Sequence, residues 1–402
     1  MAKPIGVDFG ATGIKVAMTD KTDRKGVTKV TRIGRRPLED GDVIAGRIQA
    51  KKKVATALAA ALDDIKAPKG APLAIAVGGE DVAVTLRMIP AAFKPGEWVE
   101  HLRNSKTMAE LSPTLRTVDA NISVVPLERT ANGHVVAVAG ISRKLLSDIE
   151  AVAAVTKRRI GIIEPSAASL VRSLARPLVH DVAVIADIGH SQTIIACRKG
   201  PDLLWVECIP AGGKMITEVL AQQFKMSQED AAQLKATLHA EDVDDDAFGK
   251  YDAHERAVGF MEDDDDEDVW GKANVRDIDP EDAAAQAERD QTKALTARVD
   301  ELIDDIASII ESRIRDEGAP APDGVVITGR GGLVPGTVDR MQERLRVPVH
   351  GGLPMADIAV NKFSRPYVQR DPSGGSKSYR VPSSTQRDFA VAIGAAQHPQ
   401  VR

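Results

Sequence analysis

The N-terminal segment GVDFGATGIK, residues 6–15, combines residue types that could bind a phosphate group and a divalent cation. Its turn consists of small residues, Gly10, Ala11, Thr12 and Gly13. Glycine lets backbone N–H groups approach an anion closely. Lys15 offers a positive charge to phosphate, and the carboxylate of Asp8 can hold the water shell of Mg²⁺. Short glycine motifs also match by chance, so an ordinary β-hairpin is the alternative interpretation.

Two later glycine turns favour the phosphate interpretation. The apolar run Val182–Ile188 contains Asp187 near its end and leads into a turn with Gly189, His190 and Ser191. This repeats the arrangement around Asp8, which suggests two related halves that face each other across one polyphosphate. The third turn follows an apolar run at 325–327 and consists of Gly329, Arg330, Gly331 and Gly332. The helix predicted after it would favour an anion at its N-terminus.

The elements that must position these turns follow from the periodicity of apolar residues. Alternation or short apolar runs predict strands at 5–9, 14–18, 27–33, 73–77, 82–89, 122–127, 135–141, 160–163, 182–188, 194–197, 203–209 and 325–327. Helical spacing predicts helices at 47–65, 96–111, 143–158, 214–224, 294–317, 336–345 and 389–396, with two more beginning near 164 and 228. Ser142 and Ser227 stand where N-cap residues are required.

Composition limits the class of protein. Hydrophobic residues make up 43% of the 402 residues, an ordinary share for a globular protein of two or three domains. No apolar run approaches the roughly 20 residues of a membrane-spanning helix. The N-terminus enters a strand at once, so we expect no signal peptide. The two cysteines, Cys197 and Cys208, fall in predicted strands, which favours buried free thiols.

The net charge of −5 is unevenly distributed. Residues 241–290 contain 20 acidic and 5 basic residues, so the rest of the chain has a net charge of +10. Because residues 239–291 lack apolar periodicity, we predict a disordered acidic insertion there. An EF-hand calcium loop at 242–253 is excluded, since Ala247 and Ala253 occupy the required glycine and glutamate positions. The basic remainder suits an anionic ligand or an acidic partner, or serves solubility alone.

Taken in order, the motifs resemble those of the actin-like ATPase superfamily. DFGATGIK (8–15) is similar to its first phosphate motif, IGIIEPSAAS (160–169) to its connecting helix, ADIGHSQT (186–193) to its second phosphate motif and VVITGRGG (325–332) to its adenosine motif. Within the superfamily the chain most resembles the PilM family of type IV pilus assembly proteins, with the cell-division protein FtsA next. Segments 87–92, 208–235, 334–349 and 388–396 add to this resemblance.

The resemblance implies an α/β fold of the actin-like ATPase type, with two related domains around a nucleotide cleft and an inserted 1C-type subdomain. Residues 1–72 would begin the first domain, 73–158 would form the insertion and 159–180 would return to the first domain. Residues 181–402 would form the second domain, including the acidic insertion.

The resemblance also implies roles for single residues. Asp8 and Asp187 would hold Mg²⁺ through water on either side of the phosphates of ATP. Lys15 would contact these phosphates, and Glu164 would be a catalytic carboxylate near the metal and the attacking water. Lys235 would lie near the adenine. The other nucleotide-binding positions would be Gly10, Ala11, Thr12, Gly13, Gly189, His190, Ser191, Gly213, Gly329, Arg330, Gly331 and Gly332.

Three positions depart from the superfamily pattern. Ala232 replaces a glutamate that would contact the ribose, Arg330 replaces the middle glycine of the adenosine motif, and Ile194 stands where many relatives have aspartate. We therefore expect ATP binding with at most slow hydrolysis.

By resemblance, the chain would be a cytoplasmic ATP-binding scaffold of the type IV pilus assembly machinery. It would bind the short cytoplasmic tail of a PilN-like inner-membrane protein, between subdomains 1A and 1C, and so be held at the membrane without inserting into it. No nucleic-acid partner is implied. An FtsA-like filament protein is one alternative, although the sequence closes on AAQHPQVR rather than on an amphipathic helix. A nucleotide-free scaffold is a second alternative, and a small-molecule kinase would need a carboxylate base that no motif marks.

Overall fold

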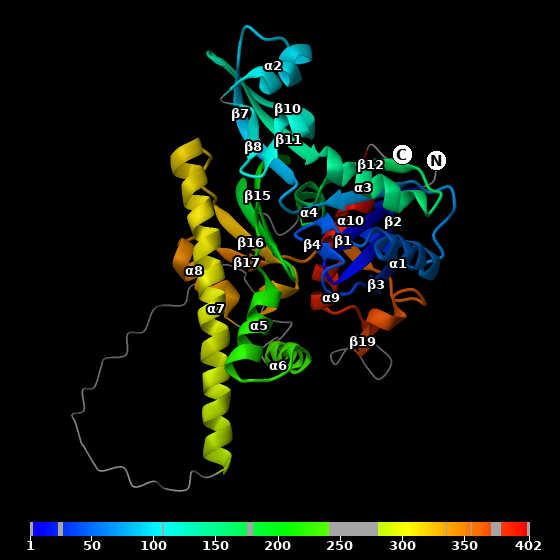
Figure 1. The fold of residues 1–402 in the computed structure, drawn as a ribbon, viewed down its shortest axis with the longest axis vertical. Coiled ribbons are helices and arrows are strands. Elements are labelled where there is room, and N and C mark those ends of the chain that lie inside the picture. The colour runs from blue at the N-terminus through cyan, green and yellow to red at the C-terminus, as the bar shows by residue number, and fades with distance from the viewer. Residues whose placement is uncertain are drawn as a thin grey trace, which may run out of the picture.

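The computed structural model describes residues 3–22, 27–106, 108–174, 180–240, 280–334, 336–354, 356–370 and 379–399. These residues form two main sheets surrounded by helices (Figure 1). Most of the predicted acidic insertion, residues 241–279, lies outside the described residues. The prediction of disorder is wrong at both ends of 239–291. Residues 239–240 end helix α6 (Gln228–Ala240), and residues 280–291 belong to helix α7 (Pro280–Glu317), which was predicted to begin only at residue 294.

The first sheet contains six strands within the described ranges. Their order is β12 (Ile160–Pro165), β6 (Leu73–Val77), β1 (Ile5–Gly10), β2 (Gly13–Thr22), β3 (Thr28–Pro37) and β18 (Ala356–Ile358). Strands β1, β2 and β3 form an antiparallel meander, whereas β6 and β12 continue the sheet in parallel on the other side of β1.

The second sheet contains eight described strands. Their order is β10 (Ala120–Thr130), β11 (Gly133–Ser142), β7 (Val82–Pro90), β15 (Asp202–Ile209), β14 (Thr193–Lys199), β13 (Val182–Ile188), β16 (Gly324–Thr328) and β17 (Val349–Gly351). From β15 onward the order repeats that of the first sheet, with an antiparallel meander followed by two parallel strands. The predicted relation between the two halves is therefore confirmed by their topology.

The remaining elements are short or lie outside the sheets. Three two-stranded ribbons pair β4 (Val43–Ile44) with β5 (Arg47–Ile48), β8 (Glu110–Ser112) with β9 (Leu115–Arg116), and β19 (Gln369–Arg370) with β20 (Tyr379–Arg380). The other α-helices are α1 (Lys51–Asp64), α2 (Trp98–Asn104), α3 (Arg143–Ala154), α4 (Ser166–Ser173), α5 (Gly213–Gln223), α6 (Gln228–Ala240), α8 (Thr337–Leu345), α9 (Ser383–Asp388) and α10 (Ala390–Ala396). None of the helices in the described ranges is long and apolar enough to cross a bilayer.

Both predicted N-caps form. The Ser142 hydroxyl accepts a hydrogen bond from the backbone N–H of Leu145, which starts α3. The Ser227 hydroxyl accepts one from the backbone N–H of Asp230 at 3.0 Å, at the start of α6. The cysteines are free thiols, and burial raises the pKa of both Cys197 and Cys208 to about 12.

The region 73–158, predicted as an insertion, begins and ends inside the first half. β6 pairs with β1 and β12, and α3 packs against α1. Only the middle of the region lies outside the first half. Its strands β7, β10 and β11 belong to the second sheet, which they join through the pair Val84–Val206. The helix predicted over 96–111 is wrong in its second part, because α2 ends at Asn104 and Leu111 enters a small core across the β8–β9 ribbon.

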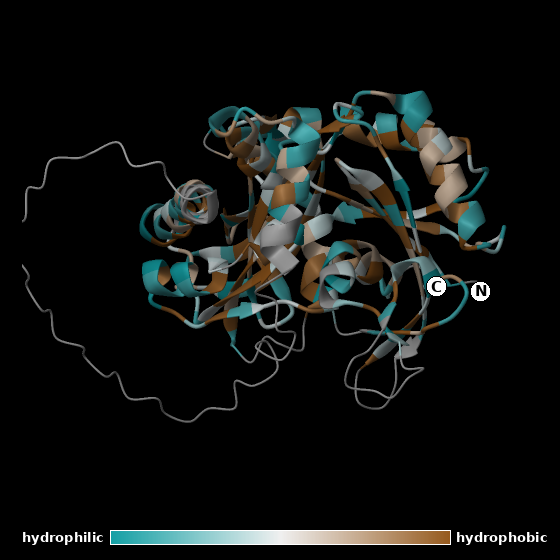
Figure 2. Cartoon of the chain, turned by 90° about the horizontal axis from the view of Figure 1, so that it is seen from below, coloured by the Kyte–Doolittle hydropathy of each residue, from teal (hydrophilic) through white to brown (hydrophobic). Residues whose placement is uncertain are grey.

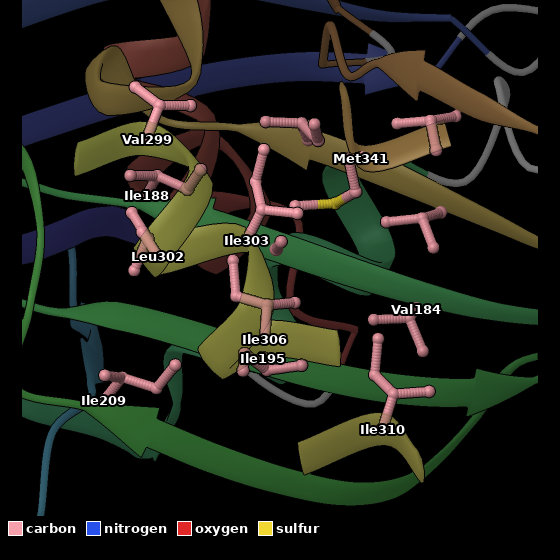
Figure 3. Packing of buried hydrophobic residues seen from close by; sticks show 14 of the residues in the cluster. Val184, Ile188, Ile195, Ile209, Val299, Leu302, Ile303, Ile306, Ile310 and Met341 are labelled. Atoms are coloured by element: carbon pink, nitrogen blue, oxygen red, sulfur yellow. The ribbon is translucent and has the colours of Figure 1, made fainter. Parts of the chain in front are cut away.

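Helices α5, α7 and α8 pack on one face of the second sheet. The apolar side of α7 turns Val299, Leu302, Ile303, Ile306 and Ile310 toward the strands (Figure 3). Hydrophobic residues are likewise concentrated on the strands and on the helix surfaces that face them (Figure 2).

Helices α4 and α10 lie between the two halves (Figure 1). One buried cluster contains Ala74 of the first sheet, Ile185 of the second, Leu170 of α4 and Ala395 of α10. The backbones approach very closely here. A Cβ atom on Gly6 of β1 would lie 1.9 Å from the carbonyl oxygen of Ala392 in α10.

Gly6→Ala should therefore destabilise the protein by about 1–3 kcal/mol, since overpacking against a backbone atom forces the structure to shift. Urea-induced unfolding would measure the loss. Gly70→Ala is the matched control, because no heavy atom lies within 4 Å of its added Cβ. Equal stabilities of the two variants would show that α10 moves away from β1 at little cost.

Candidate functional site

The central strands of the two halves each carry a carboxylate just before a glycine turn. Asp8 in β1 pairs with Lys15 in β2 across the first hairpin. Asp187 in β13 pairs with Ile194 in β14 and, on its other side, with Thr328 in β16. Ile194, one of the three positions that depart from the superfamily pattern, thus places an apolar side chain beside Asp187.

The ammonium group of Lys15 is the centre of a charge cluster. Its Nζ lies 3.0 Å from Oδ2 of Asp8 and 3.2 Å from Oδ1 of Asp388. Arg35 approaches the other oxygen of Asp388 at 3.7 Å and donates to the carbonyl and hydroxyl oxygens of Thr12, both at 3.1 Å. The side chains of Lys15, Asp8 and Asp388 are at most 15% exposed, so water screens these charges only weakly.

The charges of this cluster, together with burial, shift the pKa values of its members in different directions. Burial would lower the pKa of Lys15, but Asp388, Asp8 and Asp187 together raise it well above its ordinary value. Burial and then the charge of Asp8 raise the pKa of Asp187 to about 7, although Lys15 acts the other way. Burial alone would raise the pKa of Asp388, yet Lys15 and Arg35 hold it below its ordinary value. Asp388 is therefore ionised at neutral pH, whereas Asp187 is partly protonated.

The second turn is anchored to the start of α5. The Gly189 N–H donates to the carbonyl of Gln192 at 2.9 Å, and the Gly213 N–H donates to the carbonyl of Gly189 at 2.9 Å. The Lys214 N–H donates to the carbonyl of His190 at 2.7 Å. Within the described residues, the buried hydroxyl of Ser191 has no hydrogen-bond partner. Buried polar groups are normally paired, so a hydroxyl left open in this turn fits an anionic ligand.

The third turn lies directly against Asp187. Gly329 has a φ of 77°, and a Cβ atom there would lie 2.5 Å from Oδ1 of Asp187. A Cβ on Gly331 would lie 2.3 Å from Cγ2 of Ile188, and one on Gly332 2.4 Å from Cγ2 of Ile327. Only glycine fits these positions without movement. Arg330 is exposed, so its replacement of a glycine does not force a side chain into this contact.

A cationic group borders the second turn on its other side. Nζ of Lys235 in α6 donates to the carbonyl of Gly213 and to the hydroxyl of Thr217, both at 2.6 Å. Burial, followed by the charge of Arg330, lowers the pKa of Lys235 to about 8. Burial and then the charge of Lys235 also lower the pKa of His190.

Glu164 is held in a different environment. It stands two strands from Asp8 in the first sheet, through the register Asp8–Ala76–Glu164. Its carboxylate accepts a hydrogen bond from Ser169 at 2.6 Å, forms an ion pair with Arg172 and lies 3.4 Å from Nε2 of His398. Both oxygens are thus occupied by neighbouring side chains, so this geometry does not support the predicted catalytic role.

Asp388 and Arg35 were not predicted as site residues. Asp388 opens the segment DFAVAIGAA, which was used only as part of the family resemblance. Arg35 faces Lys15 because these residues are partners in the β2–β3 pair. The predicted third strand stops at residue 33, whereas β3 continues to Pro37, and this extension would have revealed Arg35.

The raised pKa of Asp187 predicts a pH-dependent cost to folding. An unfolded aspartate titrates near pH 4, so between about pH 4 and pH 7 the folded state holds a proton that the unfolded state has lost. The contribution of Asp187 to stability therefore falls as the pH rises through this window. Asp187→Asn should be more stable than the parent at pH 8, and the difference should shrink toward pH 5.

Urea unfolding at pH 5, 6.5 and 8 measures this difference. The matched control is Asp202→Asn, which removes an exposed carboxylate from the same sheet. A constant difference between Asp187→Asn and the parent at all three pH values would contradict the prediction.

Known structures share this architecture. No protein-family model matches the sequence, and no curated protein sequence matches it. The solved PilM–PilN type IV pilus biogenesis complex is similar, with a TM-score of 0.67 and 17% identity over 98% of both chains. The ethanolamine utilization protein EutJ from Carboxydothermus hydrogenoformans has a TM-score of 0.49 and 12% identity, over 98% of this chain and 89% of EutJ. The archaeal actin homolog Ta0583 has a TM-score of 0.41 and 13% identity over 98% of both chains. The chain has the actin-like ATPase fold, and it shares that fold with the PilM structure along nearly its whole length.

Proposed function

We propose that the chain binds Mg·ATP between the turns 10–13 and 189–192, and that it serves as an actin-like scaffold in type IV pilus assembly. One observation carries the nucleotide proposal. Lys15 and Asp8 form an ion pair beside the glycine turn that joins β1 to β2, and Asp187 lies beside the equivalent turn that joins β13 to β14 in the other half. The fold shared with the PilM structure over 98% of both chains supports the pilus assignment.

The residues present fit a magnesium nucleotide. Lys15 and the Ser191 hydroxyl would contact phosphate oxygens, and Asp8 and Asp187 would hold Mg²⁺ through water. The metal would neutralise part of the phosphate charge. Gly329 leaves open the space beside Asp187 that a Cβ atom would fill. Lys235 and Gly213 would border the nucleoside, with Arg330 within electrostatic reach of Lys235.

The same residues favour binding over rapid hydrolysis. Glu164 is engaged by Ser169, Arg172 and His398, and Ile194 stands opposite Asp187. The isoleucine cannot accept a proton from an attacking water, and both carboxylate oxygens of Glu164 already face neighbouring side chains. The proposed protein is therefore a nucleotide-responsive scaffold with at most slow turnover.

The proposed partner is a PilN-like membrane protein whose short cytoplasmic tail binds beside the inserted strands. Two exposed apolar side chains there share one face of the sheet. Val125 in β10 pairs with Ala137, and Ala137 pairs with Leu86, two residues before Met88 in β7. Since residues two apart in a strand point to the same side, Val125 and Met88 lie on the same face of the sheet, at 47% and 41% exposure.

Isothermal titration calorimetry tests the nucleotide proposal. Lys15→Met should weaken ATP binding by about 10–100-fold, because it removes charge-assisted hydrogen bonds to phosphate. Asp187→Ala should weaken binding chiefly when Mg²⁺ is present. Lys199→Met, an exposed lysine in β14, is the matched control. No heat with ATP would favour the nucleotide-free scaffold, and equal affinity with and without Mg²⁺ would remove the metal from the proposal.

A pull-down with the cytoplasmic tail of a PilN-like protein tests the partner. Met88→Asp and Val125→Asp should each reduce binding about tenfold or more, because a charge replaces apolar contact area. Val360→Asp is the control, since Val360 is equally exposed and apolar but lies outside the inserted strands. If both variants bind the tail like the parent, the tail binds elsewhere.

A further inference from the structure

Asp388 forms ion pairs with the two cationic side chains that a bound phosphate would need, Lys15 and Arg35. Its Oδ1 lies 3.2 Å from Nζ of Lys15, and its Oδ2 lies 3.7 Å from Nε of Arg35. Arg35 in turn donates to the carbonyl and hydroxyl of Thr12 inside the first phosphate turn. A carboxylate therefore bridges Lys15 and Arg35 as an oxyanion of a ligand would.

We propose that Asp388 is a gating carboxylate, which competes with the polyphosphate of the ligand for Lys15 and Arg35. This inference rests on the proposed nucleotide binding and adds a residue that sets its strength. A ligand phosphate would have to take Lys15 from Asp388, and the displaced carboxylate would then repel the phosphate. While it is paired with Lys15 and Arg35, Asp388 is ionised at neutral pH, because these cations hold its pKa below the ordinary value even though burial opposes them.

The position of Asp388 connects this exchange to the C-terminal segment. Asp388 ends α9 and is separated from α10 by Phe389 alone. Helix α9 contacts the short 3₁₀ helix η3 (Arg330–Leu333), and α10 packs against β1 and α4 between the two halves. Movement of Asp388 on phosphate binding would therefore act on the layer that joins the halves.

Two roles for Asp388 make opposite predictions. If Asp388 merely orients Lys15 for the ligand, its removal should weaken phosphate binding. If it competes with the ligand, Asp388→Asn should tighten binding, because Lys15 and Arg35 lose the charged partner that they share and the repulsion of the phosphate disappears. A purely structural residue would not produce tighter binding when replaced.

The experiment is a calorimetric titration of the parent and of Asp388→Asn with inorganic tripolyphosphate, with ATP and with adenosine. Asp388→Asn should bind tripolyphosphate and ATP on the order of tenfold more tightly, with adenosine affinity unchanged. The matched control is Asp64→Asn, which breaks the exposed ion pair of Asp64 with the neighbouring Arg36 at 2.6 Å and should leave all three affinities unchanged. Asp388→Ser repeats the test if the amide variant does not fold.

The outcomes separate this inference from the proposed function. If the parent binds ATP and a folded Asp388 variant binds it equally or more weakly, the gating role is overturned while the nucleotide proposal stands. If only the variant binds tripolyphosphate, the gate is supported. If neither protein binds ATP or tripolyphosphate, both proposals fail.

Discussion

The close contact of α10 with β1 and α4 is the constraint on which the two-halved architecture depends. Gly6 and Gly394 lack side chains at the points where a Cβ atom would lie 1.9 Å from a carbonyl oxygen of the neighbouring element. Alanines fill much of the surrounding cluster, which suits a chain with only 3% aromatic residues. Because the helices fit into this narrow space, the central strands of both halves end near each other, with Asp8 and Asp187 at their ends.

This arrangement concentrates charge where little water screens it. Three carboxylates, Asp8, Asp187 and Asp388, share the electrostatic environment of Lys15. Asp187 has no ion-pair partner among the described residues, and its raised pKa expresses the cost of keeping it ionised. An unfavourable arrangement of charges of this kind is typical of ligand-binding sites. If the side chains neutralised one another fully, a charged ligand would gain no further electrostatic stabilisation from them.

Local pattern predicted the parts of the site that depend on neighbours in sequence. A strand followed by a small-residue turn identified Asp8, Lys15 and Asp187, and the repeat of that pattern predicted the fold. Contacts between distant segments were not predictable in the same way. Asp388 forms an ion pair with Lys15 although the two residues lie near opposite ends of the sequence. Strand β6 joins the first sheet although its sequence equally suited a separate subdomain. Glu164 matched a family motif, but its surroundings are set by Arg172 and His398, which no motif marks.

The lowered pKa of Lys235 gives this position a chemical reactivity of its own. With a pKa of about 8, roughly half of the Lys235 side chains are neutral amines at pH 8. An ordinary lysine, with a pKa near 10.4, is neutral in well under about 1% of molecules at that pH. Neutral amines are the nucleophilic form, so a larger share of Lys235 than of exposed lysines is in the form that acylating reagents attack. A single covalent label there would sit beside Gly213, and its rate of attachment would report whether the adjoining turn is covered.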